Sequence, residues 1–157
     1  MKQILASFAV LALLWGCGAN QTATSTDTGS APVIANGIEI RNYWATPTPG
    51  GVTLSAGYLT IVNHASAGDT FLGANSARAN NVDVHTMRME NGVMEMRPAG
   101  TLAIPPGGAL TLAPNGLHLM FTDVTAPFTE GETIPVTLHF DHGGDIEVNM
   151  PVRRTPP

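Results

Sequence analysis

The sequence has one cysteine, Cys17, among its 157 residues, and it has no lysine after Lys2. A domain that begins beyond Cys17 can form neither a disulfide nor a thiolate metal site, which excludes a blue-copper electron-transfer centre. Six arginines then face twelve acidic residues, a net charge of about −6. This negative charge argues against nucleic acid or an anionic membrane surface as a partner.

No apolar run is long enough to span a bilayer. The longest, Ile4 to Leu14, has eleven residues and follows Lys2. That length is typical of a signal-peptide core rather than of a transmembrane helix. We therefore expect residues 1–16 to be a signal peptide that takes no part in the fold.

The end of this run resembles a bacterial lipobox. In Leu14-Trp15-Gly16-Cys17, leucine lies three positions before the cysteine and a small residue precedes it. This pattern predicts lipidation at Cys17 and a protein tethered outside the cytoplasm, in the periplasm, by its lipid alone. The alternative is an ordinary secretory cleavage site beside a free thiol. Gly18, rather than Asp, follows the cysteine, which predicts outer-membrane sorting where the cell has an outer membrane.

Residues 17–32 are rich in Ser, Thr, Gly and Ala without apolar periodicity, so they predict a flexible linker. From residue 33 to residue 157 there is no helical period, and turn signals recur every eight to twelve residues. This spacing is typical of an all-β sandwich or barrel. Ten strands are expected, at residues 37–45, 53–63, 70–76, 82–89, 92–97, 101–104, 109–112, 117–122, 133–141 and 146–152, with a hairpin turn at Asn91-Gly92.

Two histidines and two methionines stand out within the predicted strands. They follow the spacing H-x10-M-x21-H-x-M, as His85, Met96, His118 and Met120. Thioether sulfur with imidazole nitrogen is a soft donor set that favours Cu(I) over Zn(II), Mg(II) or Ca(II). Five of the six methionines beyond the initiator fall in the stretch 87–120. Copper binding is therefore the first functional hypothesis.

Strand alternation predicts which face each ligand occupies. Val82 and Val84 should face the core while His85 faces away from it. In the segment 117–122, Leu119 and Phe121 suit the core. His118 and Met120 then lie side by side on the other face, a spacing that suits chelation.

Other side chains near this set have alternative roles. Met87, Met89 and Met94 could act as auxiliary ligands that help to hand copper on, with packing at the solvent edge as the favoured alternative. Asp83 and Glu95 adjoin ligands in the sequence and could support an imidazole through hydrogen bonds. The favoured alternative is that, as strand neighbours of ligands, they point to the opposite face.

Farther from the set, Trp44 and Tyr58 are expected to be core or rim aromatics. A second nitrogen and oxygen site for Cu(II) or Zn(II) at His139 and His142 is expected only if the strand ends at Asp141.

The spacing and its flanking sequence, Met89 to Pro98 and Gly116 to Met120, resemble the PCu(A)C family of periplasmic copper chaperones over residues 36–152. The resemblance implies a cupredoxin-like Greek-key β-sandwich or barrel whose four ligands bind one Cu(I) at an exposed end. It also implies delivery of copper towards the dinuclear copper site of cytochrome c oxidase, alongside a Sco-type protein.

Two other classes of function compete with a chaperone. A copper-dependent redox enzyme would need nitrogen and oxygen ligands that stabilise Cu(II), and the methionine-rich set argues against it. A metal-free structural or interaction lipoprotein would use the same sandwich and tether, but it gives no reason for the His and Met spacing. The sequence therefore predicts a copper chaperone that is not an enzyme.

Overall fold

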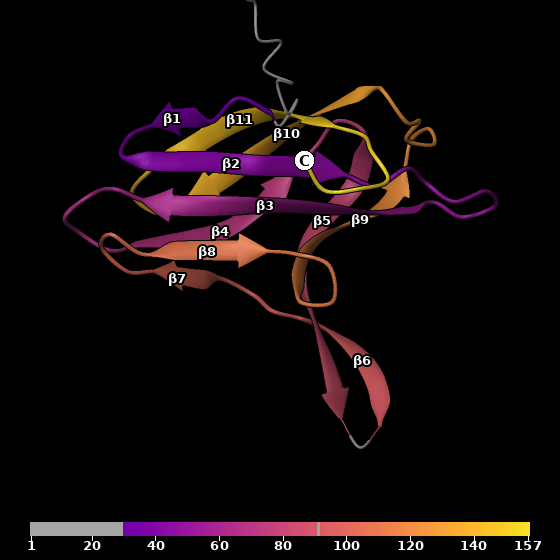
Figure 1. Cartoon of the computed structure of the whole chain (residues 1–157), viewed down its shortest axis with the longest axis horizontal. Coiled ribbons are helices and arrows are strands. Elements are labelled where there is room, and N and C mark those ends of the chain that lie inside the picture. Colours follow the sequence, from indigo (N-terminus) through magenta and orange to yellow (C-terminus); the bar gives the residue numbers. More distant parts are fainter. Residues whose placement is uncertain (1–29, 91) are drawn as a thin grey trace, which may run out of the picture.

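The protein folds into two antiparallel β-sheets (Figure 1). The computed structural model describes residues 30–90 and 92–157. The predicted signal peptide, Cys17 and residues 17–29 of the predicted linker lie outside these residues. In the described part, no helix is long and apolar enough to cross a membrane. The strands are β1 (Val33–Ala35), β2 (Ile38–Ala45), β3 (Leu54–Asn63), β4 (Asp69–Asn75), β5 (Ala79–Glu90), β6 (Val93–Pro98), β7 (Leu102–Ile104), β8 (Ala109–Leu112), β9 (Leu117–Val124), β10 (Thr133–Phe140) and β11 (Gly144–Pro151).

The larger sheet has the order β1-β2-β3-β9-β5-β6, and β8 also pairs with β3. The smaller sheet has the order β11-β10-β4-β7. One edge of β3 is shared by two partners, because residues 54–57 pair with β9 and residues 59–62 pair with β8. This arrangement leaves β9 between β3 and β5 in the larger sheet.

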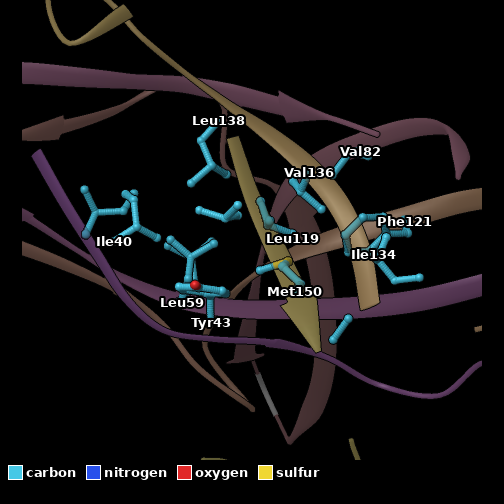
Figure 2. Packing of buried hydrophobic residues seen from close by; sticks show 14 of the residues in the cluster. Ile40, Tyr43, Leu59, Val82, Leu119, Phe121, Ile134, Val136, Leu138 and Met150 are labelled. Atoms are coloured by element: carbon cyan, nitrogen blue, oxygen red, sulfur yellow. The ribbon is translucent and has the colours of Figure 1, made fainter. Parts of the chain in front are cut away.

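Both sheets contribute apolar side chains to one core (Figure 2). Alternate residues of β9, Leu119 and Phe121, are fully buried, and they belong to the same core cluster as Val136 and Leu138 of β10. Met150 of β11 is also fully buried, so it fills the core as a methionine ordinarily does. The four predicted ligands do not belong to this cluster.

All ten predicted strands are present, with ends that differ by a few residues. The structure adds β1, which pairs with β2 through the tight turn at Asn36 and Gly37. Both turn residues have positive φ, 50° and 80°, as a two-residue hairpin turn between twisted strands requires. A strand of three residues gives too little alternation to be recognised in the sequence.

The β5–β6 hairpin of the larger sheet extends beyond the other strands (Figure 1). Its strands pair from His85 and Pro98 to Glu90 and Val93. Gly92 has a φ of 81° at the turn, where the sequence predicts a hairpin. The hairpin therefore presents the far end of β5 and all of β6 outside the core.

Candidate metal centre

His85 and His118 form a directly opposed pair across β5 and β9. Their ring centroids are 6.1 Å apart and the rings are inclined at 66°. Their strand neighbours Val84 and Leu119 are paired in the same way and are buried in the core. The two imidazoles therefore lie together on the face of the larger sheet that points away from the core, as alternation predicts.

The ring of His118 is held in one orientation by its own turn. Its Nδ1 lies 3.1 Å from the carbonyl oxygen of Gly116. A carbonyl oxygen can only accept a hydrogen bond, so Nδ1 carries the proton and Nε2 keeps a free lone pair. The His118 side chain can therefore donate an electron pair to a metal through Nε2.

His85 contains a buried polar atom without a partner. Its Nδ1 is the one such side-chain atom in the described part of the chain. Buried polar groups are nearly always hydrogen-bonded, so an orphaned ring nitrogen calls for an explanation. A metal bound through Nδ1 would provide one, because coordination would use the lone pair of this nitrogen.

A pocket of about 250 Å³ lies beside the histidine pair. Three predicted ligands, Met96, His118 and Met120, line it together with Met87. Met96 is 45% exposed, whereas His118 is only 3% exposed. The resemblance implies an exposed site, and the exposure is uneven, because Met96 is open to solvent while His118 is buried. Three of the four predicted ligands thus share this pocket, and the fourth, His85, is opposed to His118 without lining the pocket. Metal binding by the set stays a prediction.

One aromatic residue, Tyr58, also lines the pocket. Its ring centroid is 4.7 Å from that of Trp44, which is buried. Burial raises the pKa of the Tyr58 phenol, so the hydroxyl stays neutral near pH 7. The sequence indicates a rim aromatic here but not its place in the pocket wall.

The prediction for Asp83 is wrong. Asp83 pairs directly with Met120 and lies two residues before His85, so it shares the face of the ligands. Adjacent residues of a strand lie on opposite faces, but residues two apart lie on the same face. This rule could have placed Asp83 on the face of His85 from the sequence. Glu95 does follow the prediction, since it pairs with Arg88 on the other face of the hairpin.

Oxygen donors do not complete a metal site around the histidine pair. Within residues 30–90 and 92–157, no three His, Cys, Asp or Glu side chains gather closely enough to hold a metal ion. A metal at His85 and His118 would therefore draw on methionine sulfur. Such a mixed nitrogen and sulfur set suits Cu(I).

His139 and His142 are not brought together as a second site. β10 ends at Phe140, before the turn that carries His142. The Nδ1 atom of His139 lies 2.7 Å from Oδ1 of Asp145, whereas Nδ1 of His142 lies 3.6 Å from Oδ1 of Asp69. Each histidine thus has its own acidic neighbour.

Comparison with known proteins identifies the family. The family described as "Putative lipoprotein LpqE-like" matches residues 38–152. "Putative lipoprotein Lxx21020" of Leifsonia xyli subsp. xyli (strain CTCB07) is 32% identical over 146 residues, which cover 92% of this chain and 85% of the relative. The chain belongs to the LpqE-like family.

Solved structures similar to this LpqE-like protein include apo and copper-bound forms. The copper-bound PCuAC domain from PmoF2 superposes with a TM-score of 0.67 at 24% identity, over 80% of this chain and 99% of that domain. The Cu(I) form of DR1885 from Deinococcus radiodurans gives a TM-score of 0.55 at 26% identity, over 80% of this chain and 83% of that one. The predicted PCu(A)C resemblance and all-β, cupredoxin-like fold are confirmed.

Proposed function

We propose that this LpqE-like protein is a Cu(I) carrier that binds one ion through His85, Met96, His118 and Met120. The observation that carries the proposal is the opposed histidine pair, with its orphaned ring nitrogen, beside a pocket lined by both methionines. The copper-bound relatives of the same fold support it. Copper is the cargo of such a protein and not a catalytic cofactor, so no enzymatic activity is proposed.

The donor set suits a protein that must release its cargo. Two imidazoles and two thioethers are all neutral, so a bound Cu(I) ion keeps a net charge of about +1. Thioethers hold Cu(I) by softness and not by charge, which lets a partner's ligands displace them one at a time. The exposed side of Met96 would be the first contact for such a partner.

The proposed setting is outside the cytoplasm. The lipobox at Cys17 and the lipoprotein name of the family both favour a protein tethered by its N-terminal lipid. The family resemblance further favours delivery towards the dinuclear copper site of cytochrome c oxidase, with a Sco-type protein as a second partner. Anaerobic incubation of the Cu(I)-loaded protein with the copper-free soluble domain that carries this oxidase site tests the proposed recipient. Absence of copper transfer would contradict it.

An anaerobic Cu(I) titration in competition with bicinchoninate tests the site itself. We expect the wild type to withdraw one Cu(I) ion per chain from bicinchoninate. The Met96→Ala, Met120→Ala double variant should lose this tight binding. The matched control is Leu54→Ala, because Leu54 lines the same pocket, is 40% exposed and has no donor atom. Equal affinity in the wild type and the double variant would leave the metal-free lipoprotein module as the better account.

A further inference from the structure

The β5–β6 hairpin carries two directly opposed methionine pairs. Met87 pairs with Met96, and Met89 pairs with Met94 one step nearer the turn. Opposed residues of an antiparallel pair share a face, and so do residues two apart on one strand. All four thioethers therefore share the face that His85 occupies farther along β5.

Packing does not account for the pair nearer the turn, Met89 and Met94, which we call the outer pair. Met89 is 67% exposed and Met94 is 49% exposed, whereas the core methionine, Met150, is fully buried. Large apolar side chains at such exposure gain little from burial. The sequence-based alternative of packing at the solvent edge therefore leaves the presence of two opposed methionines unexplained.

Charged groups of the hairpin lie on its other face. Arg88 pairs with Glu95, and the guanidinium of Arg97 contacts the carboxylates of Glu95 and Glu90, the latter at 3.5 Å. These residues alternate with the methionines along β5 and β6. The hairpin thus presents neutral sulfur on one face and hydrated charge on the other. A soft cation would find thioethers without competing carboxylates.

Met87 connects the outer pair to the main site. It is half-buried, lines the pocket with His118 and Met120, and is directly opposite Met96. Residues two apart on a strand are separated by about 6.8 Å, and opposed Cβ atoms by about 5 Å. Flexible methionine side chains can span these distances, so a Cu(I) ion at the outer pair could reach Met87 without leaving sulfur ligands.

We propose that Met89 and Met94, together with Met87, form a second Cu(I) position made only of thioethers, through which the His and Met site is loaded and unloaded. This inference rests on the proposed function, because it supplies the route to that site. Copper remains Cu(I) throughout, and the thioethers exchange as neutral ligands. No electron or proton has to be transferred at this position.

Anaerobic Cu(I) titration of the full chain, with bicinchoninate as competitor, tests the second position. The wild type should take up one tight and one weaker equivalent, and the weaker one should show only sulfur neighbours by X-ray absorption. The Met89→Leu, Met94→Leu variant should lose the weaker equivalent, keep the tight one and load more slowly from the Cu(I)–bicinchoninate complex. Leucine keeps the volume and apolar character, and both sites are exposed, so the thermal unfolding midpoint should not change.

The control is Val93→Leu, because Val93 lies in the same hairpin, is 61% exposed and has no donor atom in its side chain. It should bind and load as the wild type does. If the Met89→Leu, Met94→Leu variant keeps the weaker equivalent, or if the wild type never binds it, only the second Cu(I) position is overturned. A wild type without the tight equivalent instead refutes the proposed function, so the two failures are distinguishable.

Discussion

His85 and His118 are directly opposed on adjacent antiparallel strands, although β6, β7 and β8 lie between them in the sequence. Both histidines belong to regular strands and not to loops. Their separation is therefore set by the backbone pairing of β5 and β9, which the buried neighbours Val84 and Leu119 hold in register. A Cu(I) ion would meet a histidine pair that is already assembled.

Copper affinity should depend on acidity. A protonated imidazole has no lone pair to offer, so protons compete with Cu(I) for both histidines. Affinity for Cu(I) should therefore fall in acid, by up to about tenfold per pH unit for each coordinating histidine. Competition titrations at neutral pH and at about pH 5 measure this loss. Unchanged affinity at the lower pH would contradict coordination by His85 and His118.

The metal-free protein should contain one tautomer of His118. The Gly116 carbonyl accepts from Nδ1, so the proton should be on Nδ1 and not on Nε2. Long-range ¹⁵N–¹H NMR correlation of the imidazole distinguishes the two forms near neutral pH. A proton on Nε2 would mean that this nitrogen is not ready to bind copper.

Gly57 should not tolerate a side chain. It pairs with Leu119 beside the site strand, and a Cβ there would lie 2.8 Å from Cε2 of Phe121. Because Phe121 is fully buried, Gly57→Ala should reduce the free energy of unfolding by about 1 to 3 kcal/mol. Urea denaturation measures the loss. Gly50→Ala is the control, since its Cβ would meet nothing within 4 Å, and an equal loss there would contradict the packing argument.

Asp69 should contribute to stability in a pH-dependent way. Burial alone would raise the pKa of its carboxyl, but the backbone N–H groups of His142, Thr70 and Gly143 outweigh burial and lower the pKa. The lowered folded-state pKa means that this contribution is complete above about pH 3.9 and is lost as pH falls through the folded value. Asp69→Asn should therefore cost about 1.5 to 3 kcal/mol at pH 7 and progressively less below about pH 4.

Urea unfolding of both proteins at neutral and acidic pH checks the Asp69 prediction. Asp145→Asn serves as control, because the Asp145 side chain is 69% exposed, and such surface changes usually stay within about 0.5 kcal/mol. A difference between wild type and Asp69→Asn that grows in acid would contradict the sign of the pKa shift.

Turn signals in the sequence were sufficient to place ten strands, and alternation placed the faces of His85, His118 and Met120. It identified Val84 and Leu119 as core residues and set His85 and His118 on the other face, because a strand's period of two is a local property. The hairpin at Gly92 was likewise readable from its turn residues.

Proximity between distant strands was not readable in the same way. Nothing local to β5 and β9 says that they are neighbours, since three strands separate them in the sequence and their register depends on the buried face. The place of Tyr58 in the pocket was not readable for the same reason, because Tyr58 reaches the pocket from β3. Asp83 is different, since its misplacement came from applying the alternation rule to the wrong spacing.

The core closes without any of the four candidate ligands. Folding and cargo binding then draw on separate sets of side chains, so the empty and the loaded protein can share one scaffold. Such a carrier does not need copper in order to fold. It therefore stays folded after it releases the ion, and it can bind another one. The same separation lets the ligand set change by mutation while the sandwich persists.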